Sequence, residues 1–183
     1  MSDKKVANTP VMKQFLEIKE KYKDSILLFR MGDFYETFLN DAIITSKILG
    51  IVLTKRSNGK ASNVDLAGFP YHSLDNYLPK LVKAGHRVAI CEQVEDPKKV
   101  KGIVKREVVE VVTPGTLLSD RTLNHKSNRY IGSLQIIKNN VGYAFLDSAT
   151  GDFNIGECRY SDFKTIILKY LPHEIVISDD ITY

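Results

Sequence analysis

The stretch Ile26-Leu27-Leu28-Phe29-Arg30-Met31-Gly32-Asp33-Phe34-Tyr35-Glu36 decides how this chain is expected to fold. Its apolar start is typical of a buried strand. Gly32 permits a sharp turn, because it lacks the Cβ that disfavours positive φ. Asp33 is a good helix N-cap, and Glu36 completes a capping-box pattern three residues later. The pattern predicts a strand, a turn at Gly32 and a helix that begins at Phe34.

Local structure does not explain Phe34. A large aromatic residue beside a polar turn either folds back onto the core or faces solvent or a ligand. The sequence leaves both alternatives open, and Phe34 is therefore the first candidate for a binding residue.

Outward from this stretch, apolar periodicity and turn residues predict alternating helices and strands. We expect helices over residues 10–22, 34–49 and 73–84, and strands over 26–29, 51–54, 64–68, 87–91 and 104–113, with 51–54 and 64–68 forming a hairpin. Pro79 conflicts with the third helix, which must start near Asn76 or be kinked. The alternation predicts an α/β domain with a mixed β-sheet flanked by helices.

After residue 118 the chain changes character. Residues 119–128 are polar and are interpreted as a linker between a domain at 1–118 and an incomplete α/β segment at 129–183. In that segment we expect three meandering strands at 130–137, 141–147 and 153–158, then a helix at 162–170 and a strand at 175–178.

Charge and composition limit the partners. Up to residue 120 the chain has 19 Lys and Arg against 15 Asp and Glu, and afterwards 7 against 7, so the net charge of +4 lies in the first part. This favours an anionic partner. No apolar run approaches the roughly 20 residues that cross a bilayer, and we expect no membrane association. The separated Cys91 and Cys158 indicate reduced thiols and a cytoplasmic location.

Five short motifs occur in order along the first part. Together they resemble the N-terminal mismatch-recognition domain of the MutS family of DNA mismatch repair proteins, over residues 9–117. The motifs are Met31-Gly-Asp-Phe-Tyr-Glu36, Leu53-Thr-Lys-Arg56, Ala67-Gly-Phe-Pro-Tyr-His72, Ala89-Ile-Cys-Glu-Gln93 and Val112-Thr-Pro-Gly-Thr116.

The resemblance implies roles for two residues. Phe34 would wedge into the minor groove at a mispair, and Glu36 would hydrogen-bond a mispaired base. A wedge suits this task, because stacking on an aromatic ring is worth about 1–3 kcal/mol per base while opening a base step costs a few kcal/mol. These terms nearly cancel on matched DNA and become favourable at a weakened pair. The alternative for Glu36, a helix-capping residue only, stays open.

Other residues near these motifs are candidate DNA contacts with ordinary structural alternatives. Lys55 and Arg56 can contact phosphate or simply be solvated, Tyr35 is expected to pack inward, and no partner makes His72 a general base. The candidate contacts are Met31, Gly32, Asp33, Lys55, Arg56, Tyr71 and His72.

The second segment resembles the start of the MutS connector domain, which has an RNase H-like topology. This allows a rival hypothesis, a nuclease that holds two Mg²⁺ ions with Asp147, Asp152 and Glu157. The alternative is that the two aspartates serve the local hydrogen bonding of a turn. A second rival is a protein-interaction module without mismatch specificity.

The resemblance also implies what this chain does not contain. No Gly-x-x-x-x-Gly-Lys-Ser/Thr motif is present, so we expect a non-enzymatic fragment without catalytic residues, metal or cofactor. The full-length family member is a DNA-dependent ATPase that uses ATP and Mg²⁺. Its implied partners are double-stranded DNA with mispairs or small loops, a second copy of itself as a homodimer, and a downstream repair protein of the MutL type.

Overall fold

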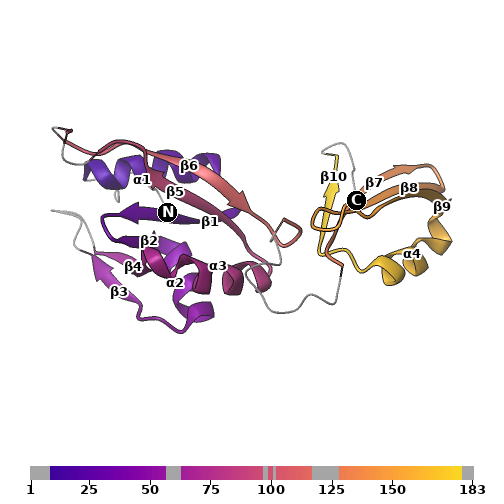
Figure 1. Cartoon of the computed structure of the whole chain (residues 1–183), viewed down its shortest axis with the longest axis horizontal. Helices are drawn as coiled ribbons and strands as arrows, with labels where there is room; N and C mark the ends of the chain where they lie inside the picture. The colour runs from indigo at the N-terminus through magenta and orange to yellow at the C-terminus, as the bar shows by residue number, and fades with distance from the viewer. Residues whose placement is uncertain (1–8, 57–62, 97–98, 101, 117–127, 179–183) are drawn as a thin grey trace. The chain divides into compact units, whose positions relative to one another are not determined.

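The computed structural model describes residues 9–56, 63–96, 99–100, 102–116 and 128–178. The chain divides into two compact units, Met1–Val112 and Thr113–Tyr183, whose elements are labelled in Figure 1. The predicted linker at 119–128 lies outside the described residues except for Asn128, so its boundaries stay a prediction.

The first unit is built on a six-stranded mixed sheet with the strand order β3-β4-β2-β1-β5-β6. Only β1 and β5 pair in parallel; the other neighbours are antiparallel. This confirms the predicted α/β class. The strands are β1 Ser25–Met31, β2 Phe34–Phe38, β3 Thr54–Arg56, β4 Val64–Pro70, β5 Arg87–Gln93 and β6 Arg106–Val112.

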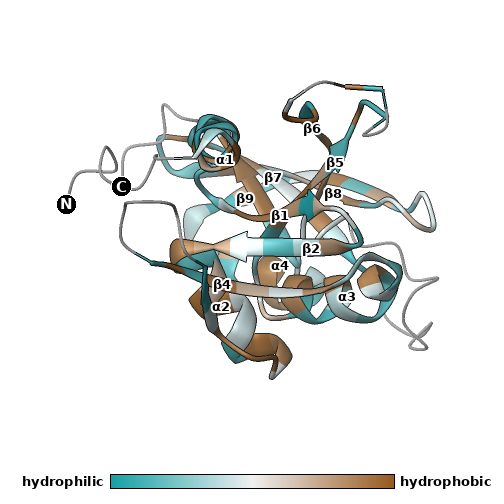
Figure 2. Ribbon diagram, turned by 90° about the vertical axis from the view of Figure 1, so that its left-hand side faces the viewer, coloured by the Kyte–Doolittle hydropathy of each residue, from teal (hydrophilic) through white to brown (hydrophobic). Residues whose placement is uncertain are grey.

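Helices cover both faces of this sheet. Helix α1 (Pro10–Lys21) lies on one side of β1 and β2, and α2 (Leu39–Leu49) and α3 (Leu74–Lys83) lie on the other (Figure 2). As predicted, α1 begins with Thr9 as N-cap and Pro10 as first residue, and the Thr9 hydroxyl accepts a hydrogen bond from the Met12 N–H at 3.4 Å. None of the described helices has both the length and the apolar character needed to cross a membrane.

The core under α1 is aromatic. Phe15 of α1 packs edge-on against Phe29 of β1 and Phe38 of β2, with ring centroids 5.6 and 4.9 Å apart. All three rings are buried, and full burial of such a side chain stabilises the fold by about 1.5–3 kcal/mol. The core therefore fixes β1 and β2 at the end of the hairpin away from its turn.

The predicted helix start at Phe34 is wrong. Gly32 and Asp33 form a two-residue hairpin turn, and the chain returns as β2 before α2 begins at Leu39. Gly32 has φ +58°, as the first residue of a type II′ hairpin turn requires. Asp33 is thus a turn residue and not an N-cap. Glu36 pairs in a sheet and closes no capping box, because β2 hydrogen-bonds to strands on both sides.

The rest of the first unit follows the prediction with three differences. The strand predicted at 51–54 is wrong: residues 51–53 form no strand, and β3 comprises Thr54–Arg56, because pairing with β4 starts only at Thr54. β3 and β4 form the expected antiparallel hairpin. Helix α3 begins at Leu74, after a 3-10 turn at Tyr71–Ser73, so a start near Asn76 is wrong and Pro79 lies inside the helix. Ser73 makes no side-chain capping hydrogen bond.

The second unit contains the predicted meander, helix and strand. Its four-stranded sheet has the order β10-β7-β8-β9, with β10 parallel to β7. Helix α4 covers one face, where Tyr170 stacks on the buried Phe145 at 4.6 Å. The elements are β7 Tyr130–Ile137, β8 Asn140–Asp147, β9 Phe153–Arg159, α4 Phe163–Tyr170 and β10 Glu174–Ile177.

Both cysteines are free thiols, as predicted. Cys91 is buried in β5, and burial raises the pKa of its thiol to about 12. A thiol with such a pKa is unreactive near neutral pH, so Cys91 acts as a small apolar core residue.

Candidate nucleic-acid interface

Phe34 and Glu36 lie on the same face of β2. Residues two apart in a strand share a face and are about 6.6 Å apart, whereas the same spacing in a helix places them on nearly opposite sides. In the strand, the side chains of Phe34 and Glu36 therefore project in the same direction, which they would not do in the predicted helix. Tyr35 between them points the other way and is buried, as predicted.

Phe34 does not fold back onto the core. Its side chain is 46% exposed at the first position of β2, where it pairs with Met31 of β1 and Pro70 of β4. An exposed phenylalanine loses the favourable burial that most aromatic rings obtain. Its position beside a two-residue turn presents the ring at the tip of the hairpin.

Hydrogen bonds hold the turn on both sides. The Arg30 Nε donates to the carbonyl oxygen of Gly32. From the 3-10 turn, the Tyr71 N–H donates to the carbonyl oxygen of Asp33 at 2.9 Å. The Tyr35 hydroxyl donates to Glu92 of β5, which anchors the hairpin from beneath. The backbone that carries Phe34 is therefore fixed by contacts to two other segments.

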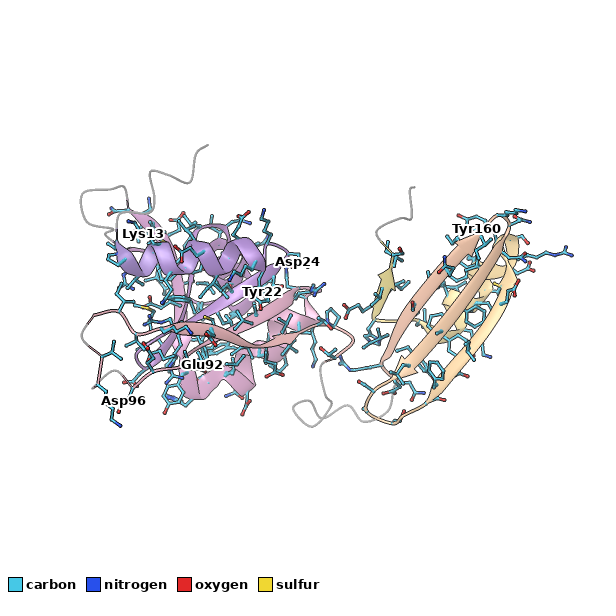
Figure 3. The ribbon with its side chains drawn as sticks, turned by 90° about the horizontal axis from the view of Figure 1, so that it is seen from above. Lys13, Tyr22, Asp24, Glu92, Asp96 and Tyr160 are labelled. Carbon is cyan, nitrogen blue, oxygen red and sulfur yellow. The ribbon has the colours of Figure 1, made fainter. Side chains whose placement is uncertain are left out.

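A stacked cation lies beside this turn. The Arg30 guanidinium carbon is 3.7 Å from the centroid of the Tyr71 ring, and His72 meets the same ring edge-on at 5.8 Å. Arg30 also approaches Glu92, with 3.7 Å between its Nη1 and Oε2. Figure 3 shows Glu92 on β5, with Asp96 farther out along the following loop. Sequence reasoning missed Arg30, although a cation inside an apolar strand was the signal.

Glu36 is paired with an arginine. Its Oε2 is 2.7 Å from Nη1 of Arg56 on β3. Burial raises the pKa of Glu36 above its usual value, while Arg56 and then Arg106 offset part of that rise. Arg106 is buried on β6, and its Nε donates to the carbonyl oxygen of Arg30 at 2.6 Å. The carboxylate is thus flanked by two cations.

The structure brings most of the predicted contacts together around the hairpin. Gly32 and Asp33 are exposed at its tip, Met31 is half-buried, and Tyr71 and His72 are exposed beside it. Lys55 differs: it is exposed on β3 and projects from the opposite side of the strand to Arg56, because consecutive strand residues alternate.

The proposed nuclease carboxylates do not converge. Asp147 accepts backbone N–H groups of Arg129, Ala149 and Thr150, and Asp152 accepts the Tyr130 hydroxyl.

Glu157 is on β9, opposite Gly142 of β8. Gly142 is five positions from Asp147, so Glu157 lies on the other face of the sheet, where it accepts a hydrogen bond from the Asn140 side chain. Within the described part of the chain, no three His, Cys, Asp or Glu side chains form a metal-binding group. The turn interpretation of the aspartates therefore fits the geometry, and the two-metal hypothesis does not.

Comparison with known protein families matches residues 9–121 to MutS domain I. This chain belongs to the MutS domain I family. The matched region contains the whole of the hairpin site and the six-stranded sheet. The five motifs that carried the resemblance therefore identified the family correctly.

Proteins named DNA mismatch repair protein MutS are similar over nearly the whole chain. The protein of Porphyromonas gingivalis is 52% identical over 174 residues, covering 95% of this chain. Those of Phocaeicola vulgatus and Chlorobaculum parvum are 51% and 48% identical, each covering 93%. The chain spans about 20% of the length of each of these relatives.

Proposed function

We propose that this chain recognises mispaired bases in double-stranded DNA for mismatch repair. The observation that carries the proposal is the exposed Phe34 ring on a hairpin fixed by other segments, with Glu36 on the same face. The names of the MutS relatives support it.

The ring acts as a mechanical probe. Insertion at a matched step has to break good stacking, which costs about as much as the ring returns. At a mispair or a small loop the stacking is already weakened, so less free energy is needed to open the step. Insertion of the same ring is then favourable overall. Preference then follows from how easily the duplex deforms rather than from a base sequence, which suits a sensor for many different mispairs.

Glu36 adds discrimination. A carboxylate repels nearby phosphates and so weakens binding to matched DNA. At a mispair, a displaced base offers a hydrogen-bond partner. Burial raises the pKa of Glu36, which is the direction that a carboxyl donating a hydrogen bond to a base would need. Arg56, Tyr71 and His72 surround the site and contact the phosphate backbone, together with Met31, Gly32, Asp33 and Lys55 in supporting roles.

Within a longer MutS protein, this unit supplies recognition and other regions supply the rest. We propose that such a protein is a cytoplasmic homodimer that uses ATP and Mg²⁺ outside these residues and passes the signal to a MutL-type protein. The support is that the chain spans only about a fifth of the MutS relatives. A protein-interaction role for the second unit stays a prediction.

The test compares two labelled duplexes that differ by one mispair, titrated with the chain in fluorescence anisotropy at several salt concentrations. The wild type is expected to bind the mispaired duplex more tightly. Phe34→Ala removes a stacking term of about 1–3 kcal/mol and brings both affinities close together. Because Phe34 is exposed, thermal unfolding of the variant should match the wild type.

The matched control is Phe153→Ala, which removes another exposed phenylalanine ring, from the second unit. It is expected to leave both affinities unchanged. A Phe34→Ala chain that keeps the wild-type preference would show that the ring is not the sensor.

A further inference from the structure

The carboxylate proposed to contact a base is already occupied in the structure. Oε2 of Glu36 is 2.7 Å from Nη1 of Arg56. The two residues are not on neighbouring strands, because β4 lies between β2 and β3. Neighbouring strands are about 4.8 Å apart, so the two backbones are about 10 Å apart. The arginine must therefore extend across the face of β4 to reach Glu36.

The face of β4 is shaped for this contact. Gly68 sits directly opposite Glu36 in the β2–β4 ladder. A Cβ at Gly68 would be 2.9 Å from the Tyr35 carbonyl oxygen and 3.4 Å from Cγ of Glu36. A Cβ here would clash with the backbone of β2 and would fill the space next to the Glu36 side chain. The glycine in the Ala67-Gly-Phe-Pro motif thus leaves the space that the Glu36 side chain occupies.

The two partners differ in exposure. The side chain of Arg56 is 40% exposed and that of Glu36 only 19%. A guanidinium binds phosphate by paired hydrogen bonds as well as it binds carboxylate. An approaching duplex therefore offers Arg56 a second partner, while Arg106, buried on β6, keeps a fixed positive charge near Glu36.

We propose that Arg56 is a specificity-determining residue that exchanges partners: it holds Glu36 in the DNA-free chain and moves to a backbone phosphate when Glu36 engages a mispaired base. The inference rests on the proposed function of the hairpin and deepens it. On matched DNA Glu36 finds no base partner and keeps Arg56.

The exchange makes Arg56 different from an ordinary phosphate contact. A plain contact strengthens binding to every duplex equally. At a mispair, the phosphate contact that an exchanging arginine gains only replaces the Glu36 contact of similar strength that it gives up. On matched DNA, its pairing with Glu36 shields the phosphates from the carboxylate. Removal of the arginine therefore weakens matched binding more than mispaired binding, and the preference for the mispair rises.

The experiment measures Kd for the matched and mispaired duplexes with wild type, Arg56→Gln and Lys55→Gln. Lys55→Gln is the matched control, because it removes the same charge from the neighbouring position without touching Glu36. We expect Arg56→Gln to raise the ratio of matched to mispaired Kd about two- to fivefold, the range for a half-exposed ion pair. Lys55→Gln is expected to weaken both duplexes equally.

The mechanism requires that Arg56 acts through Glu36. In a Glu36→Gln background, Arg56→Gln should therefore no longer change the ratio. A DNA-free measurement adds an independent reading: carbon-13 NMR titration of the Glu36 carboxyl should show a higher pKa in Arg56→Gln, with Arg106 the remaining nearby cation.

The outcomes separate the two proposals. A wild type that prefers mispairs and loses this preference with Phe34→Ala, but whose ratio is unchanged or reduced by Arg56→Gln, overturns the exchange and leaves the wedge intact. An unchanged Glu36 pKa in Arg56→Gln also overturns the exchange. A wild type without any mispair preference overturns both.

Discussion

Phe34 and Phe153 are both exposed aromatic residues, with exposed fractions of 46% and 58%, but their surroundings in the fold differ. Phe34 projects from a sheet with helices over both faces, beside a turn held by Arg30 and Tyr71. Phe153 pairs with exposed Leu146 on β8, and Ile155 follows on the same face, which no described helix covers. Exposure marks a site only where the surrounding fold is otherwise complete.

The two units also differ in how they bury their aromatic rings. In the first, Phe15, Phe29 and Phe38 meet between a helix and a fully paired sheet. In the second, Phe145 is buried against Tyr170 of the helix. The first unit thus has a core that holds its site rigid, while the second leaves one sheet face unpartnered among the described residues.

The largest expected effect contrasts a buried ring with an exposed one. Phe29→Ala should lower the free energy of unfolding of the first unit by about 3–5 kcal/mol, because it leaves a cavity under α1. Phe153→Ala should change the second unit by less than about 0.5 kcal/mol. Urea unfolding followed by amide NMR signals of each unit measures both. Similar losses for the two variants would contradict the contrast.

The next effect concerns Asp147, whose carboxylate accepts three backbone N–H groups around a turn. Asp147→Ala leaves these donors without their acceptor and should destabilise the second unit by about 1–3 kcal/mol. A catalytic carboxylate would instead be dispensable for stability. Thermal unfolding at neutral pH distinguishes the two, and an unchanged midpoint would weaken the turn interpretation.

The same residue predicts a dependence on pH. Burial raises the pKa of Asp147, but the backbone hydrogen bonds outweigh it and hold the pKa below its usual value. The stabilisation is therefore complete above the ordinary aspartate pKa of about 3.9 and is lost as the pH falls through the lower folded value. Acid unfolding of the second unit should be shallower in Asp147→Asn than in the wild type.

An effect of similar size is expected at one of two glycines in paired strands, and almost none at the other. Gly68→Ala places a Cβ 2.9 Å from the backbone oxygen of Tyr35, whereas Gly142→Ala meets only the Gln135 oxygen at 3.9 Å. Gly68→Ala should cost about 1–3 kcal/mol, and Gly142→Ala should be neutral or slightly stabilising. The measurement is the shift in the thermal midpoint of the unit that carries each substitution. Equal shifts for the two variants would show that β4 has more room at Gly68 than the structure indicates.

The sequence predicted elements whose signals are local. Thr9 and Pro10 start α1 as expected, and the meander of the second unit follows its alternating apolar pattern. The prediction from the sequence was wrong where a local signal competed with strand pairing between residues far apart in the chain. Asp33 and Glu36 form a capping pattern, but β2 pairs with β4, about thirty residues later in the chain. This sheet contact outweighs a cap worth about 1 kcal/mol.

The candidate site was predicted by residue but not by geometry. The motifs identified Phe34, Glu36, Arg56 and Tyr71, yet the ion pair between Glu36 and Arg56 could not be derived. It depends on β4 lying between their strands and on the space at Gly68, both set by tertiary structure. Arg30 was missed because its role depends on stacking with a turn forty residues away.

The most direct test of the wedge places 2-aminopurine next to the mispair and follows its fluorescence, which rises when the base loses its stacking. Saturation with the wild-type chain is predicted to raise the emission of the mispaired duplex but not of the matched one. Phe34→Ala at saturation should produce no rise. A wild-type complex without a rise, or a rise that persists in Phe34→Ala, would contradict insertion of the Phe34 ring.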